Sequence, residues 1–161
     1  MFRSRSQPVT VNARATVGIA VPPETVMSFL LDPVSAVMTG QLTERCLHLP
    51  DTPARAVGMQ HVHFSMEGGL LVAEVEELVE LEYPYRAVTV NRTTPGGITV
   101  AYTCAPRGSN ATEYTQEVWM EPSPGSAELL QDLFDAETQR CAQRIKQVLE
   151  NGEWRPPAPA G

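Results

Sequence analysis

The sequence predicts an α+β domain in which a curved antiparallel sheet of about seven strands wraps one long C-terminal helix. The first observation is a stripe of apolar residues at helical spacing that runs through residues 126–150. The second is a series of segments of period two through the middle of the chain, separated by short loops rich in glycine and proline. Because the stripe and the apolar faces of the strands must both be buried, we expect the helix to pack against the sheet.

The elements follow one another in a simple order. Residues 9–21 alternate as a strand whose apolar residues share one parity. Pro22 and Pro23 then open a short helix, since proline suits the first position of a helix, and a second short helix is expected over residues 34–39. Further strands are expected over residues 42–49, 57–66, 70–83, 85–93, 98–105 and 112–121. Consecutive strands joined by short loops pair as antiparallel neighbours.

The long helix has recognisable ends and one interruption. Ser126 can cap its first turn, and Asn151-Gly152 provides a left-handed stop. Glu137 and Thr138 break the apolar stripe. These polar residues mark either a wet or ligand-filled space or an edge of the helix that faces solvent.

Composition excludes several classes of function. The formal net charge of the 161 residues is -7, which argues against binding to nucleic acid, because few cations are available to neutralise phosphates. The same charge disfavours anionic membrane surfaces, and no apolar run is long enough to insert into a membrane.

The domain organisation is also expected to be simple. Residues 9–152 form one domain, preceded by a flexible N-terminus over residues 1–8 and followed by a disordered, proline-rich tail over residues 153–161. The three cysteines stand too far apart for a metal or redox motif, so we expect reduced thiols in the cytoplasm; they are Cys46, Cys104 and Cys141. A homodimer formed through an exposed strand is compatible with the sequence.

Local phrases accompany this order of elements, and they occupy residues 19–26, 31–33, 57–58, 79–86, 102–108, 112–114 and 146–152. In this order they resemble the START-like superfamily, also described as the polyketide cyclase/dehydrase and lipid-transport (SRPBCC, pollen-allergen-like) superfamily. The resemblance implies a helix-grip fold with a cavity between the sheet and the long helix. It also implies a hydrophobic, polyketide- or lipid-like ligand, and in some branches ring closure with loss of water. It implies no shared catalytic motif, and we expect no cofactor.

Two functions are compatible with this resemblance. A cyclase or dehydratase would orient a poly-carbonyl chain, with Arg92 or Tyr114 stabilising an enolate and His61, His63 or Glu77 moving protons. A carrier or sensor would only shield its ligand from water.

His61-Val62-His63 is the sharpest local motif. Two histidines at this spacing on a strand share one face, and Glu67 follows four residues later. The spacing resembles the first metal motif of the cupins. A cupin has another histidine downstream, whereas the only other histidine here is His48, upstream. We therefore expect no metal and interpret the pair as surface or cavity-lining histidines, with a metal-dependent cupin-like enzyme as the alternative.

The expected ligand-binding residues include a polar group on the longest strand. Glu77 has the parity of several apolar residues there, Val75 among them, and Arg92 has the parity of Val90. If Glu77 points inward, it requires a partner, and Arg92 is a candidate. The alternatives are a structural ion pair and a small shift of register that exposes Glu77.

Other polar groups interrupt apolar faces of the later strands. Tyr102, Tyr114 and Gln116 could hold oxygen atoms of a ligand in an apolar wall, or could simply pack in the core. The complete set of expected ligand-binding residues is Phe29, Val75, Glu77, Val90, Arg92, Tyr102, Tyr114, Gln116, Phe134 and Thr138.

Overall fold

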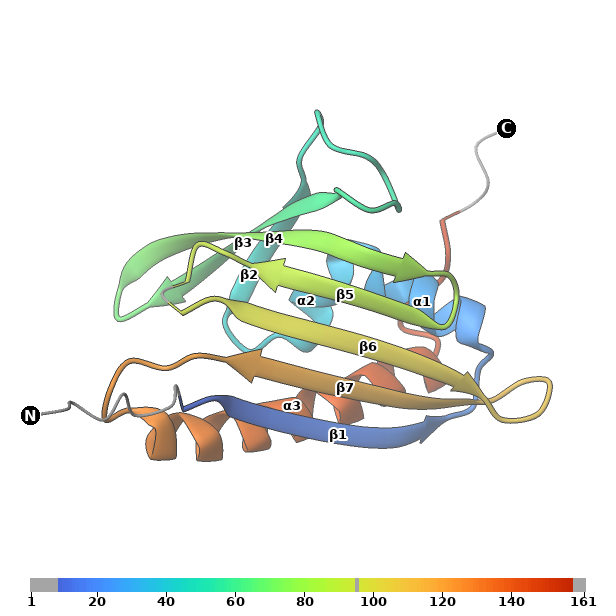
Figure 1. The fold of residues 1–161 in the computed structure, drawn as a ribbon. Helices are drawn as coiled ribbons and strands as arrows, with labels where there is room; N and C mark the ends of the chain where they lie inside the picture. Colours follow the sequence, from blue (N-terminus) through green and yellow to red (C-terminus); the bar gives the residue numbers. More distant parts are fainter. Residues whose placement is uncertain (1–8, 95, 158–161) are drawn as a thin grey trace, which may run out of the picture.

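A computed structural model describes residues 9–94 and 96–157, and it has the expected α+β architecture (Figure 1). Residues 1–8, where a flexible N-terminus is expected, lie outside the described residues. The elements are, in order, β1 (Val11–Ile19), α1 (Pro23–Leu30), α2 (Val34–Thr39), β2 (Thr43–His48), β3 (Gln60–Glu67), β4 (Leu70–Glu82), β5 (Arg86–Asn91), β6 (Ile98–Pro106), β7 (Thr112–Met120) and α3 (Ala127–Glu150).

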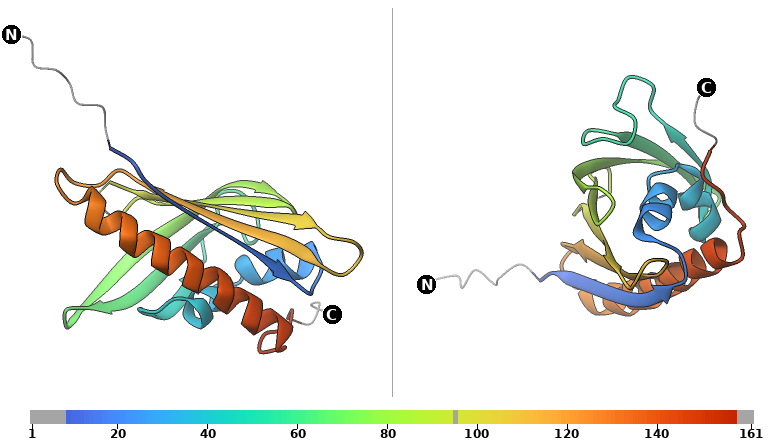
Figure 2. Two further views of the ribbon diagram at one scale, coloured as in Figure 1. Left: turned by 90° about the horizontal axis from the view of Figure 1, so that it is seen from below. Right: turned by 90° about the vertical axis from the view of Figure 1, so that its right-hand side faces the viewer.

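The strands form one seven-stranded sheet in the order β1-β7-β6-β5-β4-β3-β2, and every neighbouring pair is antiparallel. The sheet curls around the helices, with α3 crossing β1 and β7 and with α1 and α2 inside the curve (Figure 2). None of the described helices combines the length and apolar character that crossing a membrane requires. The result is a helix-grip arrangement with one enclosed face.

Alternation decides which side chains enter the enclosed face. Along β1, every second residue from Val11 to Ile19 is buried, and the residues between them are exposed. The pairing register carries this face across the sheet, because Val17 lies opposite Tyr114 on β7, and Tyr114 lies opposite Cys104 on β6. The core forms where these residues meet the apolar side of α3, including Ile145.

A β-bulge divides β4 into two parts. The register against β5 shifts between Leu78 and Glu80, so one extra residue is inserted there. Before the bulge, the even-numbered residues Glu76 and Leu78 face the interior; after it, Leu81 packs against the core. The inward parity therefore changes within one strand.

The chain turns back after α3. Gly152 has φ = 67°, and the amide of Glu153 donates to the carbonyl of Val148 at 2.9 Å, which confirms the expected left-handed stop. Trp154 is then buried, with its ring 5.3 Å from that of Phe29. For Trp154 this differs from the expectation of a disordered tail, because an indole can bury a large apolar area even beside prolines. Residues 158–161 of that expected tail lie outside the described residues.

Candidate functional site

The space between α3 and the sheet contains an open groove with a volume of about 540 Å³. One wall is the first half of α3, the other is the inner face of β3, β4 and β6, and the α2–β2 connection forms one side. The lining residues are Gly40, Gln41, Leu42, Thr43, Ser65, Glu67, Glu74, Ile98, Leu133, Ala136, Glu137 and Arg140. Apolar and polar side chains are mixed here, so the groove suits a ligand of mixed character.

A smaller cavity of about 60 Å³ lies further along the same inner face. Its walls are Leu30, Ser35, Ala36, Thr39, His61, His63, Glu76, Tyr102, Cys141 and Ile145. The two spaces lie end to end, because Ser65 of the groove is two residues from His63 on β3, and Glu74 is two residues from Glu76 on β4. We call this smaller space the inner cavity.

Arginines of α3 fix the side of the site formed by α2. Arg140 donates to the carbonyl of Thr39 at 2.7 Å and is held by Glu137 one turn before it. Arg144 donates to the carbonyl of Met38 at 3.2 Å. The guanidinium groups thereby satisfy carbonyl groups at the end of α2, which otherwise lack partners.

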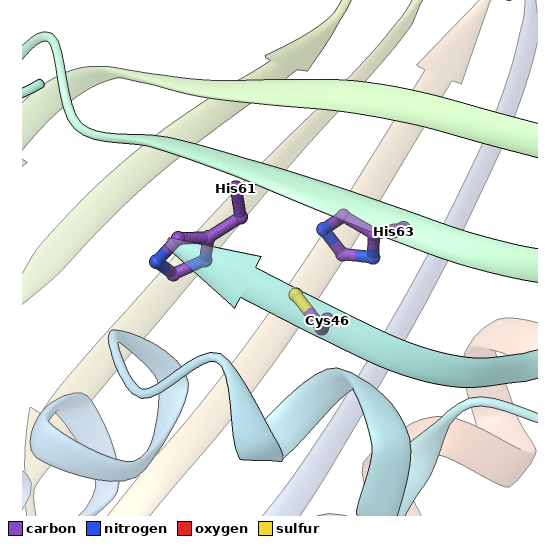
Figure 3. A group of neighbouring side chains, drawn as sticks. All are labelled: Cys46, His61 and His63. Atoms are coloured by element: carbon purple, nitrogen blue, oxygen red, sulfur yellow. The ribbon is translucent and has the colours of Figure 1, made fainter. Parts of the chain in front are cut away.

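A cluster of three side chains lies at the edge of the inner cavity, and two of the three line it. His61 and His63 point inward from β3, and the register with β2 places Cys46 opposite His63. Figure 3 shows the sulfur of Cys46 directed toward the two imidazoles. One possible ligand atom from each of the three residues lies within 4.8 Å of the other two.

Polar atoms around the inner cavity lack partners. Within the described part of the chain, Nε2 of His61, Nε2 of His63 and Oγ1 of Thr89 are buried and make no hydrogen bond. Glu76 Oε1 is 3.8 Å from His63 Nε2, which is longer than a hydrogen bond. Because unpaired buried polar atoms are costly, these groups indicate a place for a polar ligand atom, water or a metal ion.

The fold perturbs the titration of these groups. Burial lowers the pKa of His61, with Glu76 acting in the opposite direction. Burial also acts to lower the pKa of His63, but the neighbouring Cys46 and Glu76 side chains outweigh it and raise that pKa to about 10. Burial acts to raise the pKa of Glu76, but His63 outweighs it and the pKa is lowered. The inner cavity thus contains the His61 imidazole, whose neutral form is favoured, the His63 imidazole, whose protonated form is favoured, and the Glu76 carboxylate.

Several other expected site residues also lie inside the fold. Tyr102 lines the inner cavity. Tyr114 and Gln116 face the interior but satisfy each other, since the Tyr114 hydroxyl donates to Gln116 Oε1 at 3.1 Å. Burial raises the pKa of both tyrosine hydroxyls well above its ordinary value. Phe29 packs against Trp154.

The helical candidates lie near the groove without lining it. Thr138 is buried and Phe134 is half-buried. Neither is among the residues that line the groove or the inner cavity.

Four expected residues lie on the outer side of the sheet, which corrects the sequence interpretation. Val75 and Glu77 alternate with the inward Glu76 on β4, and Val90 lies opposite Glu77 on β5. Arg92 is exposed just beyond β5 and lines a shallow outer hollow together with Val90. For Val75 and Glu77 the cause is the bulge in β4, which makes the parity of Leu81 misleading for the residues before Leu78. On β5, Thr89 and Ala87 lie opposite the inward Leu78 and Leu81, so Val90 and Arg92 have the outward parity.

Two residues of the site, Glu76 and Cys46, are not among the residues expected from the sequence. Glu76 has the parity opposite to that of Glu77 on the longest strand, and Cys46 stands in no recognisable motif. Glu67, which completes a cupin-like spacing, lies at the end of β3, where the Ser65 hydroxyl donates to its carboxylate at 3.4 Å. The one sequence signal for Cys46 is its spacing of two residues from His48, which places both side chains on one face of a strand but does not show which strand that face meets.

Comparisons with known proteins show the fold through structure alone. No family model and no curated protein match the sequence. Among solved structures, an aromatase/cyclase named Zhui from Streptomyces sp. R1128 is similar with a TM-score of 0.74 and 13% identity, over 91% of this chain and 97% of the other. A point mutant of norcoclaurine synthase from Thalictrum flavum, in complex with a transition state analogue, gives a TM-score of 0.70 and 10% identity, over 93% of this chain and 100% of the other.

A START superfamily protein from Mycobacterium smegmatis is similar with a TM-score of 0.68 and 15% identity, over 88% of this chain and 95% of the other. Near-complete coverage in each case means that the whole arrangement of sheet and helices is shared. The chain therefore has the START-like helix-grip fold.

Proposed function

We propose that this chain binds a hydrophobic small molecule of the polyketide class in the groove between α3 and the sheet, and that its inner cavity moves protons on that molecule. The groove volume of about 540 Å³ is within the range of small-molecule sites. Leu133 and Ile98 can contact an apolar ring or chain from opposite walls. The structural neighbours that are named as an aromatase/cyclase support this class of ligand by analogy of fold.

The observation that carries the proposal is the set of unpartnered polar groups at the inner end of the groove. A carbonyl oxygen that enters the inner cavity would meet the imidazoles of His61 and His63 and the hydroxyl of Tyr102. Such groups can exchange a proton with a bound carbonyl compound or its enol.

The reaction that suits this arrangement is an intramolecular aldol closure followed by loss of water. A base removes a proton from a carbon beside one carbonyl, and that carbon forms a bond with a second carbonyl carbon. The oxygen of the second carbonyl takes up a proton and leaves as water with a further C–H proton. The groove would hold both carbonyl groups close together, which is the main contribution that positioning makes to such a step.

A carrier or sensor is the second candidate. Leu42 is 58% exposed and Leu133 is 56% exposed, and both line the open groove. Exposed apolar side chains at an opening favour uptake of an apolar ligand. In this case the inner cavity would only hold an oxygen atom of the ligand.

Binding can be tested with a groove-filling variant and a matched control on the same helix. Ala136 lines the groove, whereas Leu129 is exposed on α3 and does not. We expect Ala136→Trp to weaken binding of an aromatic poly-carbonyl compound by at least about 10-fold, because the indole takes the space of the ligand. Leu129→Trp should leave the affinity unchanged in isothermal titration calorimetry. Equal affinities for the two variants would exclude the groove as the site.

Catalysis is separated from carriage by Tyr102→Phe. If the chain is an enzyme, this change should reduce the rate of ring closure about 100-fold while the affinity changes little, because only a proton donor is removed. Chromatography of the product measures the rate. Binding without any product from the wild-type chain would support the carrier instead.

A further inference from the structure

The Cys46–His61–His63 cluster includes a thiol that proton transfer by the two imidazoles does not require. One thiol and two imidazoles meet at the inner cavity from two adjacent strands. We propose that these three residues bind one Zn²⁺ ion. This inference goes beyond the proposed function and does not depend on it.

The donor set matches the preference of zinc. Thiolate sulfur and imidazole nitrogen are its usual protein ligands, with bonds of about 2.3 Å and about 2.0–2.1 Å. Donors around a tetrahedral ion with these bonds lie roughly 3.3–3.6 Å apart. The three donor atoms here lie within 4.8 Å of one another, so small side-chain rotations bring them to that geometry.

The scaffold holds the donors in place. Antiparallel pairing sets Cys46 opposite His63 and His48 opposite His61, and side chains at i and i+2 on β3 share a face. Regular strands position ligands with less freedom than loops. The site therefore needs no rearrangement of the backbone to accept an ion.

Burial and missing partners point to a ligand independently of the composition. His61 is 6% exposed and its Nε2 has no hydrogen bond to any described residue; the same holds for the buried Nε2 of His63. A metal ion satisfies such nitrogen atoms directly, whereas leaving them unpaired is costly. His61 also lines a surface hollow of about 230 Å³, which gives an ion access from solvent.

Charge and geometry complete the description of the site. One Zn²⁺ ion carries two positive charges, and the Cys46 thiolate with the nearby Glu76 carboxylate carries two negative charges. Three protein ligands leave a fourth position, and the cluster borders the inner cavity. Glu76 is outside the three-residue cluster, but its Oε1 lies 3.8 Å from Nε2 of His63, so its carboxylate places a negative charge directly beside the proposed ion.

The direct test uses the wild-type chain without a histidine tag. The protein is stripped with a chelator under reducing conditions, reloaded with Zn²⁺ and measured by native mass spectrometry and X-ray absorption. We expect one zinc per chain with one sulfur at about 2.3 Å and two nitrogens at about 2.0–2.1 Å. Failure to retain stoichiometric zinc, or a zinc shell without sulfur, would overturn the proposal.

Variants identify the ligands. Replacing Zn²⁺ by Co²⁺ should give a thiolate-to-cobalt charge-transfer band, and Cys46→Ser should abolish it. His61→Ala and His63→Ala should each weaken metal binding by more than the roughly 100-fold that loss of a supporting outer residue can cost. Cys141→Ser is the matched control, because Cys141 lines the same cavity but lies outside the cluster. A band that persists in folded Cys46→Ser protein would exclude Cys46.

The groove-filling variant separates this proposal from the proposed function. Ala136→Trp should retain one zinc per chain even where it no longer binds an organic ligand. Loss of ligand binding with intact zinc binding would show that the ion is held without any contribution from the groove. Loss of both in folded protein would contradict an ion held by the strands alone.

Discussion

Cys104 on β6 illustrates how far the fold can remove a single side chain from water. It is fully buried in the core, opposite Tyr114. Burial raises the pKa of its thiol from the ordinary 9.0 to about 12. A thiol in this state neither meets a reagent nor ionises at ordinary pH.

We therefore expect Cys104 to be alkylated by iodoacetamide at pH 8 at least about 1,000-fold more slowly in the folded than in the unfolded chain, since a pKa raised by three units reduces the thiolate by that factor. Mass spectrometry of peptides measures the rate for each cysteine separately. Similar rates for Cys104 in both states would show that the core opens readily.

The same burial affects stability at high pH. The unfolded thiol ionises near its ordinary pKa of 9.0, whereas the folded thiol stays neutral until its pKa of about 12. Ionisation therefore favours the unfolded chain, and the contribution of Cys104 to stability is lost as the pH rises above about 9.

At the scale of single elements, the turn between β5 and β6 depends on glycine for a steric reason. Gly96 has φ = 85°, and a Cβ atom there would lie 2.0 Å from the carbonyl oxygen of Glu121. Gly108, in the turn between β6 and β7, has φ = 70° but no atom within 4 Å of such a Cβ. A substitution at Gly108 therefore measures backbone strain alone, whereas a substitution at Gly96 measures backbone strain together with steric overlap.

Gly108→Ala should lower the free energy of unfolding by about 1–2 kcal/mol, which is the cost of a left-handed conformation. Gly96→Ala should cost at least about 2 kcal/mol more, because backbone atoms must also move apart. Urea denaturation followed by circular dichroism gives both values. Equal costs would mean that the β5–β6 turn can move away from Glu121 freely.

Another element-scale contact joins the end of α3 to the end of β1. Glu150 Oε1 accepts from the amide of Ala20 at 2.8 Å and from Lys146 Nζ at 2.6 Å, and the same Nζ donates to the carbonyl of Gly18 at 2.6 Å. Lys146 and the Ala20 amide lower the pKa of Glu150 below its ordinary 4.5. This network closes one end of the layer between helix and sheet.

Glu150→Gln should reduce the free energy of unfolding at pH 7 by about 1 kcal/mol, because a partly exposed ion pair and one charge-assisted hydrogen bond are weakened. The folded pKa is depressed, so the stabilisation is present above pH 4.5 and is lost as the pH falls through the folded pKa. Urea titrations at pH 7 and pH 3 should therefore show a smaller difference between variant and wild type at pH 3. A constant difference would assign the effect to packing.

The strands also show what could and could not be predicted from the sequence. Regular alternation correctly placed Tyr102, Tyr114 and Gln116 on the inner face, because no bulge interrupts β6 or β7 in the register. On β4, glutamates and apolar residues occur in both parities, so periodicity could not locate the bulge that turns Glu76 inward and Glu77 outward. One inserted residue reverses, for every position of β4 before the bulge, which side of the sheet the side chain faces.

Long-range pairing sets a second limit on prediction. Cys46 and His63 meet only because β2 and β3 pair in one register across the intervening loop. Neither the spacing nor the composition of the two segments specifies that register. The histidine pair was visible in the sequence, whereas its thiol partner was not.

At the scale of the whole molecule, the fold encloses its interior by wrapping a sheet around helices and covering the far end with the chain after α3. The groove opens beside the first half of α3, and the segment after Gly152 packs at the other end of that helix (Figure 2). Trp154 Nε1 donates to Asp32 Oδ2 at 3.1 Å while its ring packs against Phe29. Pro157 lines the hollow that also contains His61. Residues 153–157 thus form part of the wall of the hollow next to His61, and a homodimer remains a prediction.

Trp154→Ala should consequently reduce the free energy of unfolding by about 3–5 kcal/mol, the usual cost of removing a large buried aromatic side chain. Trp154→Phe should cost less, because a ring still packs against Phe29 and only the hydrogen bond to Asp32 is lost. Urea denaturation followed by far-ultraviolet circular dichroism measures both, and the broader hollow in the alanine variant should also speed hydrogen exchange around His61. If Trp154→Ala changed stability by less than about 1 kcal/mol, the value of a surface substitution, the segment after α3 would be a tail in solution after all, and the interior would have to be closed by α1 and α2 alone.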